Sequence, residues 1–363
     1  MPELALEDLV VPQMADLAAY TPEQGRYAVR LDANEAPALL RPEARVRLAE
    51  QVAGTAWERY PDATARELRE AIAAQAGVSA DEVLVGVGSD EVIALLLTVL
   101  ARPRGRAREG LLVTTTPTFV MYRQSAKVRG LRVMEVPLDD RWNLAVDSML
   151  KAIEMGSPNI VFIASPNNPT GTTASSAELE RVIEAATGAL VVIDEAYVDY
   201  ARGDHLELYR RHDNVAILRT LSKIGFAALR LGWLLAHPEL VRELDKARLP
   251  YNISTPSQQL GRVVLSELGG EIELVRRTVI DERERVGGEL SHMPRVDVTP
   301  SEANFLWIRT ERPAGEVFAD LAERGVLVRS FHRRGGRLAH QLRVTIGRRD
   351  QNDAFLSALG EVA

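Results

Sequence analysis

The chain has 363 residues, of which 46% are hydrophobic and 26% are charged, a composition typical of a globular protein with about two domains. Its net charge of −7 disfavours a general nucleic-acid surface, because neutralising phosphates needs a basic face. The absence of cysteine excludes disulfides, thiolate zinc sites and cysteine nucleophiles, and the six histidines form no HxxxH-type pair, so we expect no metal site.

Neither the amino-terminal segment nor the longest apolar run of the sequence predicts export or membrane insertion. The amino terminus, MPELALEDLV, is acidic and has no basic segment followed by an apolar one. The longest apolar run, residues 92–101, is too short to span a bilayer. We therefore expect a cytoplasmic protein without a membrane partner.

The amino-terminal part combines an irregular arm with two helices. Residues 1–30 are polar and irregular, and we expect them to form an arm rather than a core element. Amphipathic patterns predict helices over 42–53 and 65–76, separated by the turn signal RYPD at 59–62.

Strands and helices alternate through the middle of the chain. Predicted strands occupy 83–87, 111–114, 131–136, 160–164, 189–194 and 215–219, and helices are predicted near 92–100, 119–128, 144–154 and 175–187. Strands that are apolar on both faces indicate a mostly parallel sheet covered by helices on two sides.

Helices dominate after this region, at 256–268 and 270–290, before a closing segment with strands near 304–308, 326–329 and 341–346. This order predicts a large α/β domain over residues 41–290. A smaller α+β domain is then made from both ends of the chain, residues 1–40 and 291–363.

The sequence Gly86-Val87-Gly88-Ser89-Asp90-Glu91 passes from a strand through a glycine turn into a helix. Free N–H groups at a helix amino terminus can bind a phosphate, in which case any contact from Asp90 comes from its backbone. Simple capping of the helix by Ser89 is the alternative. Glu91 stands where a dinucleotide-binding motif has its last glycine, which disfavours a nicotinamide-dependent dehydrogenase.

Two further motifs follow buried strands. SPNNPTG, at 165–171, is a rigid turn at the carboxyl end of a predicted parallel strand, where ligand sites of α/β proteins lie. Asp194 ends the next strand, with Tyr197 three residues later. A carboxylate at this depth needs a cation, so it is either part of a site or a structural cap or ion pair.

Lys223 lies in TLSKIGFAALRLGW, at 220–233, directly after another buried strand. Lysine occurs only at 127, 151, 223 and 246, so 40 of the 44 basic residues are arginine. The other three lysines lie on expected solvated helix positions. Lys223, beside Ser222, is therefore the candidate for a nucleophilic amine.

Arg329 and Arg343 interrupt apolar runs on the two closing strands. A solvated arginine is the ordinary expectation in an arginine-rich chain, but a cation within an apolar run normally has an anionic partner. The basic run 331–337 is open to two interpretations, a solvated loop, which we favour, or a surface that attracts an acidic substrate.

The ordered set of motifs resembles the fold type I, pyridoxal-phosphate-dependent aminotransferases, and among them the histidinol-phosphate aminotransferases. The motifs are LDANEAP (31–37), RYPD (59–62), VGVGSDE (85–91), TPTFVMY (116–122), SPNNPTG (165–171), VIDEAY (192–197), TLSKIGFAALRLGW (220–233) and LRVTIG (342–347). The resemblance covers nearly the full length. It implies a seven-stranded, mostly parallel sheet between helices, plus a smaller α+β domain.

The resemblance also implies roles for individual residues. Lys223 would bind pyridoxal 5'-phosphate covalently and move a proton, with Asp194 on the ring nitrogen and Asn168 and Tyr197 on the 3′ oxygen. The catalytic residues would thus be Lys223, Asp194 and Tyr197. The remaining cofactor contacts would be Phe119 on the ring face, with Ser89, Asp90, Ser222, Arg230 and, from a neighbouring subunit, Tyr60 on the phosphate.

For the substrates, the resemblance implies L-histidinol phosphate and 2-oxoglutarate, the latter converted to glutamate by a ping-pong mechanism in histidine biosynthesis. Arg329, Arg343 and Tyr20 would hold the substrate anions and Asn34 would lie nearby, because a guanidinium accepts either a carboxylate or a phosphate. The use of Tyr60 implies a homodimer with shared active sites.

Two alternatives within the cofactor class stay open. One is an aminotransferase for aromatic or other amino acids, and the other is an enzyme resembling threonine-phosphate decarboxylase. Outside the class, a non-enzymatic regulatory module is disfavoured because Lys223, Asp194 and Asn168 occur together.

Overall fold

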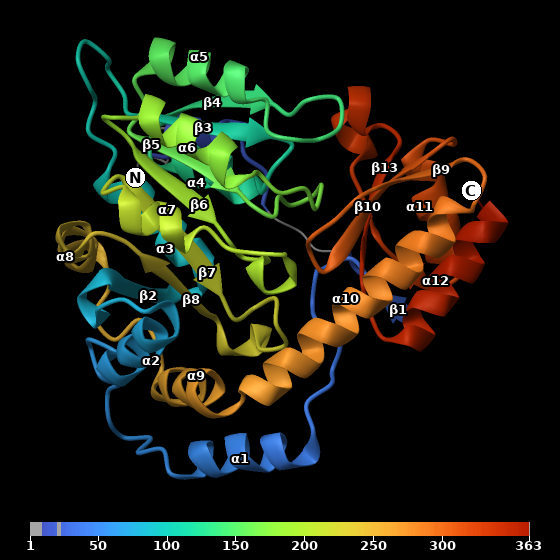
Figure 1. Ribbon diagram of the computed structural model, residues 1–363, viewed down its shortest axis with the longest axis horizontal. Helices are drawn as coiled ribbons and strands as arrows, with labels where there is room; N and C mark the ends of the chain where they lie inside the picture. The colour runs from blue at the N-terminus through green and yellow to red at the C-terminus, as the bar shows by residue number, and fades with distance from the viewer. Residues whose placement is uncertain (1–8, 20–22, 363) are drawn as a thin grey trace, which may run out of the picture.

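The computed structural model describes residues 9–19 and 23–362 (Figure 1). A seven-stranded sheet has the order β2-β8-β7-β6-β5-β3-β4. Its strands are β2 (Val83–Val87), β3 (Leu111–Thr116), β4 (Arg132–Pro137), β5 (Ile160–Ala164), β6 (Leu190–Asp194), β7 (Val215–Thr220) and β8 (Leu231–Leu235). Only β8 runs antiparallel to its neighbours in this sheet, so the predicted mostly parallel sheet is confirmed.

Each buried strand sends alternate side chains into two separate cores, as the two-residue period of a strand requires. Within β5, Ile160 and Phe162 pack with α3 (Gly88–Val99), α4 (Val120–Val128) and α8 (Pro238–Ala247). Val161 and Ile163 pack on the other face. That face is covered by α2 (Arg66–Ala76), α5 (Val146–Gly156), α6 (Ser176–Ala185), α7 (Leu206–Arg211) and α9 (Thr255–Glu267). Helices on both faces explain why these strands are apolar on both sides.

A second, smaller part is built around an antiparallel sheet of order β12-β13-β10-β9. Its strands are β9 (Val296–Thr299), β10 (Phe305–Thr310), β12 (Arg329–Ser330) and β13 (Gln341–Thr345). The helix α11 (Ala314–Glu323) packs on this sheet, and α12 (Arg349–Val362) packs against α11. The 23-residue helix α10 (Gly269–Ser291) runs from the large sheet to this smaller part (Figure 1).

The amino-terminal segment joins the smaller part directly. β1 (Val29–Arg30) pairs in parallel with β11 (Val326–Leu327). The chain then crosses to α1 (Pro42–Ala53) beside α9. The two ends of the chain therefore meet, although the exact domain boundaries at residues 40 and 290 stay a prediction.

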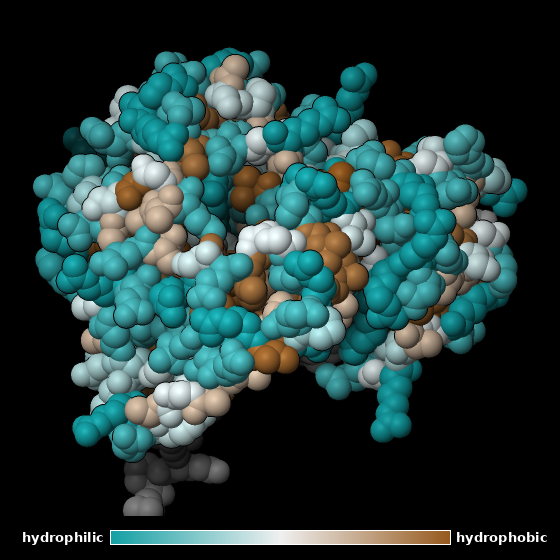
Figure 2. Space-filling view, turned by 60° about the horizontal axis from the view of Figure 1, so that its bottom comes forward, coloured by the Kyte–Doolittle hydropathy of each residue, from teal (hydrophilic) through white to brown (hydrophobic). Residues whose placement is uncertain are grey.

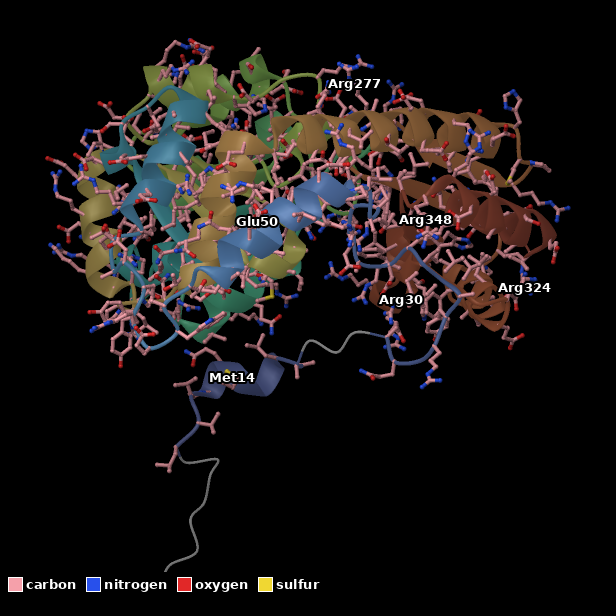
Figure 3. All side chains as sticks on the ribbon, turned by 90° about the horizontal axis from the view of Figure 1, so that it is seen from below. Met14, Arg30, Glu50, Arg277, Arg324 and Arg348 are labelled. Atoms are coloured by element: carbon pink, nitrogen blue, oxygen red, sulfur yellow. The ribbon has the colours of Figure 1, made fainter. Side chains whose placement is uncertain are left out.

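The arm before β1 has little regular structure. Residues Pro12–Asp16 form a short 3-10 turn beside α4, and Gln124 Nε2 donates a hydrogen bond to Ala18 O at 3.5 Å. Figure 3 shows Met14 on this turn, outside the main body of the molecule.

Three local features differ from the sequence-based prediction. The strand β8 was not predicted, because its first three residues belong to the lysine motif at 220–233 and no turn signal precedes them. The strand predicted near 326–329 is split between β11 and β12. The edge strand β4 exposes Arg132 and Glu135, so it is not apolar on both faces.

The described helices include no segment both long and apolar enough to cross a membrane.

Candidate active site

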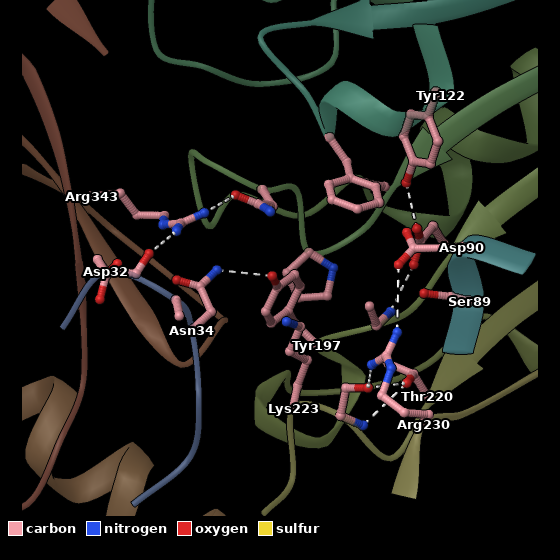
Figure 4. Close-up of a pocket in the computed structure, with 18 residues that line it drawn as sticks. Asp32, Asn34, Ser89, Asp90, Tyr122, Tyr197, Thr220, Lys223, Arg230 and Arg343 are labelled. Atoms are coloured by element: carbon pink, nitrogen blue, oxygen red, sulfur yellow. Dashed lines mark hydrogen bonds and ion pairs between the residues drawn. The ribbon is translucent and has the colours of Figure 1, made fainter. Parts of the chain in front are cut away.

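The carboxyl ends of β5, β6 and β7 meet beside a cavity of about 200 Å³ (Figure 4). Asn168 follows β5, Asp194 ends β6 and Lys223 follows β7. Parallel strands place the ends of successive elements at one edge of the sheet, which is why residues far apart in sequence converge here. Of the predicted site residues, eleven line the cavity: Asn34, Ser89, Asp90, Phe119, Asn168, Asp194, Tyr197, Ser222, Lys223, Arg230 and Arg343.

Three predicted site residues do not line this cavity. Tyr60 is 80% exposed and stacks on Tyr251, with ring centroids 4.8 Å apart. Arg329 lies beside Arg343 in the β12–β13 register but not on the cavity wall. Tyr20 lies outside the described residues.

Asp194 is a buried carboxylate, only 5% exposed. Its Oδ2 accepts a hydrogen bond from Tyr122 Oη at 2.5 Å, and its Oδ1 accepts one from Ala196 N at 2.9 Å. Burial raises the pKa of Asp194 to about 6, against the lowering effect of these hydrogen bonds. No ion pair joins it to a lysine or arginine within the described chain, so its carboxylate can still accept a hydrogen bond from a cation in the cavity.

The amino terminus of α3 forms one end of the cavity. The helix begins at Gly88 with no side-chain cap, so the alternative of capping by Ser89 is wrong. Ser89 instead lies in the first turn, where backbone N–H groups lack helical partners. Glu91 Oε2 accepts from Val87 N at 2.6 Å and Asn252 Nδ2 at 2.8 Å, which fixes the preceding loop. Glu91 thus has a structural function at the position of the missing glycine.

Two glycines keep this end of the cavity open. Gly88 has φ +74°, and a Cβ there would lie 2.7 Å from Arg230 Nη2. A Cβ on Gly232 would lie 2.3 Å from Ser89 N. Any side chain at either position would therefore displace the helix amino terminus or the arginine.

Arg230 and Ser222 complete the same end. Arg230 Nη1 donates to Ser222 Oγ at 3.4 Å, and Nη2 lies 3.7 Å from Asp90 Oδ2. The Arg230 side chain is 49% exposed and lines the cavity. A cation, a hydroxyl and free helix N–H groups together form an anion-binding end. The loop between Lys223 and Arg230 therefore brings the arginine to this end of the cavity.

Lys223 lies in the loop after β7. Its carbonyl oxygen accepts a hydrogen bond from Tyr200 Oη at 2.6 Å, and its Nζ lies 5.9 Å from the centre of the Tyr197 ring. Lys246, by contrast, forms a surface pair with Glu243. Lys223 is the only lysine that lines this cavity in the part of the chain the structure describes.

The adjacent asparagines of the SPNNPTG loop have different functions. Asn167 is 4% exposed, donates to Pro117 O and Thr170 Oγ1, and accepts from Thr118 Oγ1, so it fixes the loop. Asn168 lines the cavity. Its Oδ1 accepts from Arg343 Nη1 at 2.6 Å, which orients its Nδ2 donor.

The smaller part supplies the opposite wall. Arg343 Nη2 donates to Asp32 O at 2.6 Å. Asn34 Nδ2 donates to Tyr197 Oη at 2.9 Å, and Thr345 Oγ1 donates to Asn34 Oδ1 at 3.2 Å. Figure 4 shows Arg343, Asp32 and Asn34 on the side opposite Ser89, Asp90 and Arg230, with Lys223 and Tyr197 between them. The cavity therefore has an arginine at each end.

Sequence reasoning missed Tyr122 and Gly232 at this site. Tyr122 was within the quoted TPTFVMY motif, and it lies in the first turn of α4, where its ring meets that of Phe119, the residue before the helix. Gly232 lies in the unpredicted strand β8. Its importance follows from the close approach of Ser89, which no local pattern reveals.

The basic run 331–337 is mostly exposed, as the favoured interpretation expected. One residue nevertheless bridges the two parts of the molecule. Arg337 donates to Leu138 O at 3.1 Å and Asp139 O at 2.8 Å, and its Cζ lies 4.0 Å from the Trp142 ring centre. This contact ties the loop of the small sheet to the segment after β4.

Comparisons with known proteins agree with this architecture. Residues 27–359 match the model of the family "Aminotransferase class I and II". The chain is 39% identical to histidinol-phosphate aminotransferase 2 of Nitrosococcus oceani (96% of this chain, 95% of that protein) and 38% identical to histidinol-phosphate aminotransferase of Aquifex aeolicus (97% and 98%). It superposes on the histidinol-phosphate aminotransferase of Sinorhizobium meliloti, solved with pyridoxal-5'-phosphate, with a TM-score of 0.83 at 24% identity, covering 97% of this chain and 96% of that one.

The fold and the lysine-containing cavity define a pyridoxal-phosphate-dependent aminotransferase of fold type I. The chain belongs to the class I and II aminotransferase family and, within it, to the histidinol-phosphate aminotransferases.

The residues present fit pyridoxal phosphate. Asp194 is a buried carboxylate that forms no ion pair with a lysine or arginine among the described residues, which suits a protonated ring nitrogen. Gly88 and Gly232 let Arg230 and β8 approach the first turn of α3 closely, so the guanidinium and the helix N–H groups lie at the same end of the cavity, where an anion can bind. The amine of Lys223 lies between these groups along the cavity wall.

Proposed function

We propose that this enzyme transfers the amino group of L-histidinol phosphate to 2-oxoglutarate, in two half-reactions that share one site. The observation that carries the proposal is the strand register that sets Arg329 of β12 beside Arg343 of β13. Arg343 lines the cavity opposite its anion-binding end, and Arg329 lies next to it, off the cavity wall. The relatives named above support the same amino donor. One arginine pair can bind the phosphate of the donor in the first half-reaction and a carboxylate of 2-oxoglutarate in the second.

We assign the cofactor contacts as follows. Backbone N–H groups of Ser89 and Asp90, with Ser222, Arg230 and the partner's Tyr60, hold the phosphate, while Phe119 packs on the ring. Asp194 pairs with the ring nitrogen, and Asn168 and Tyr197 bond the 3′ oxygen. When bound, the cofactor supplies a ring that accepts the electrons released as the substrate Cα loses its proton.

The chain's own residues then hold the substrate and move the proton. Lys223 would hold the cofactor covalently, and once the substrate has replaced it, its amine would take up the proton that the substrate Cα loses. Arg343 is oriented by Asn168 and Asp32, so its guanidinium is fixed before substrate binds. Asn34 holds the Tyr197 hydroxyl, which makes Asn34 a supporting residue of the cofactor end.

Arg329→Ala should weaken the binding of histidinol phosphate about 10- to 100-fold, because a charge-assisted contact to the phosphate is lost. Binding of an unphosphorylated amino donor such as phenylalanine should change much less. Half-reaction titrations of both donors measure the ratio. Arg309→Ala, on the neighbouring strand β10 and paired with Asp297 at the surface, is the matched control. Equal losses for both donors would remove the phosphate assignment.

The alternatives differ in the fate of the substrate. L-threonine-O-3-phosphate decarboxylase from Porphyromonas gingivalis shares the fold, with a TM-score of 0.78 at 18% identity, so the fold alone does not separate amino transfer from decarboxylation.

We place the reaction in amino-acid biosynthesis and the protein in the cytoplasm. Recovery of the native protein in a membrane or secreted fraction would contradict that location.

We also propose a homodimer in which Tyr60 completes the cofactor site of the partner. Tyr60 is 80% exposed and does not line the cavity of its own chain, and nearby Trp57 and Leu249 are each 71% exposed. Large exposed apolar side chains of this kind often mark a protein contact. Figure 2 shows hydrophobic side chains gathered near the centre of one otherwise hydrophilic face.

Tyr60→Phe should weaken cofactor retention about 10-fold without dissociating the dimer, because only one hydrogen bond to the phosphate is lost. Equilibrium dialysis of the cofactor and analytical ultracentrifugation measure the two properties. Tyr27→Phe, at a surface tyrosine whose hydroxyl bonds only Gln24 O among the described residues, is the control. Hybrid dimers of one Tyr60→Phe and one Lys223→Ala protomer should retain one ordinary site. A monomeric protein with full cofactor affinity would refute the shared site.

A further inference from the structure

A buried tyrosine, Tyr122, contacts the carboxylate of Asp194 in the cofactor site. Tyr122 is fully buried, and its hydroxyl donates to Asp194 Oδ2 at 2.5 Å. Figure 4 shows this bond on the side of the carboxylate away from Lys223 and Arg343. Tyr122 has no role in the assignments made above.

Packing leaves the Tyr122 ring little freedom to move. It stacks on Phe162 of β5, with centroids 4.7 Å apart and planes at 12°. Phe119 meets it edge to face at 5.6 Å. Since Phe119 also lines the cavity, one aromatic cluster supports both the ring-stacking side chain and the carboxylate.

The surroundings of Asp194 oppose its ionised form. Burial raises the pKa of Asp194 to about 6, and the negative charge of Asp90 on α3 acts in the same direction. The hydrogen bonds from Tyr122 and Ala196 lower it, as does the charge of Lys223. Burial and the Asp194 charge raise the pKa of Tyr122 well above its ordinary value, so its hydroxyl keeps the proton that it donates.

We propose that Tyr122 is a positioning residue that holds Asp194 ionised and oriented toward the ring nitrogen of the cofactor. This inference rests on the proposed pairing of Asp194 with that nitrogen. Tyr122 also lines the cavity, but its hydroxyl is directed to Asp194, so we expect it to act through that carboxylate. Its hydroxyl occupies one lone pair of Oδ2, and the backbone N–H of Ala196 occupies one of Oδ1, so the carboxylate plane is fixed by two donors.

Tyr122→Phe tests this directly, because phenylalanine keeps both aromatic contacts and removes only the hydroxyl. Cofactor binding to the cofactor-free protein is measured by fluorescence titration between pH 5 and 9. At neutral pH, affinity for pyridoxal phosphate should fall about 10- to 100-fold, as expected for a lost hydrogen bond to a charged group. The acidic midpoint of the affinity profile should move upward by about one pH unit, because Asp194 loses a donor that favours its charge.

Tyr209→Phe is the matched control. Its hydroxyl also donates to a carboxylate, Glu82 Oε1 at 2.6 Å, outside the cavity. The control should change thermal stability by a similar amount while leaving the cofactor affinity and its pH midpoint unchanged.

A double variant separates positioning from packing, even if Tyr122→Phe is less stable than the parent. In an Asp194→Asn background, Tyr122→Phe should change cofactor affinity less than about 3-fold, since the charge that Tyr122 supports is gone. An unchanged affinity and midpoint in Tyr122→Phe, with Asp194→Asn clearly weakened, would overturn the positioning role alone. Unchanged affinity in both single variants would overturn the Asp194 assignment beneath it.

Discussion

Lys223→Ala is expected to lower the rate of amino transfer by more than about 10⁴-fold and to abolish the visible absorption of the lysine-bound cofactor. The cavity offers no second amine in its described wall, so no neighbour can replace the covalent attachment or the proton transfer. The anion-binding end and Asp194 remain intact in this variant. The protein should therefore still fold and bind pyridoxal phosphate non-covalently.

The measurement is an absorption spectrum of the purified variant with added cofactor, together with single-turnover kinetics. Lys246→Ala is the control, because its amine forms a surface pair with Glu243. An unchanged visible band in Lys223→Ala would place the covalent attachment elsewhere.

Asp194→Asn should have the second largest effect, lowering the rate about 10²- to 10³-fold, as for removal of one member of a buried charge pair. An amide cannot stabilise a protonated ring nitrogen, so the ring accepts electrons less well. Cofactor affinity should fall in parallel. Steady-state kinetics and dialysis of the cofactor measure both effects.

The pH dependence gives Asp194 a separate signature. Its pKa in the cofactor-free protein is raised to about 6, and only the ionised form can pair with the cofactor. Affinity for the cofactor should therefore be full above this value and fall as the pH drops through it, whereas Asp194→Asn should lose this step. Asp245→Asn, which breaks ion pairs with Arg69 and Arg248 outside the cavity, should retain the step.

Much of the site could be predicted from sequence because its residues lie next to strong local patterns. Asp194 and Lys223 each follow a run of apolar, β-branched residues, and parallel strands bring the ends of such runs together. Asn168 lies in a turn-forming motif at the end of another strand. Their positions at strand ends indicated that these segments meet, whereas the individual roles of Asn168, Asp194 and Lys223 came from the resemblance to the aminotransferases.

Other features depend on contacts between distant segments and could not be predicted in this way. Tyr122 has the pattern of an ordinary core aromatic on a helix, and only the packing of α4 against β5 and β6 reveals its bond to Asp194. Gly232 matters because β8 passes beneath the first turn of α3. The split between β11 and β12, which sets Arg329 beside Arg343, depends on pairing with β1 and β13.

The identity of the amino donor is tested most directly by the first half-reaction of the unmodified enzyme. Histidinol phosphate alone should convert the lysine-bound cofactor to its aminated form, with loss of the visible band, and 2-oxoglutarate should restore the band. Histidinol without phosphate and phenylalanine should convert it at least about 10-fold more slowly, because neither has a phosphate for the arginine pair. Faster conversion by either unphosphorylated donor, or release of carbon dioxide from threonine phosphate without conversion by histidinol phosphate, would contradict the proposed function.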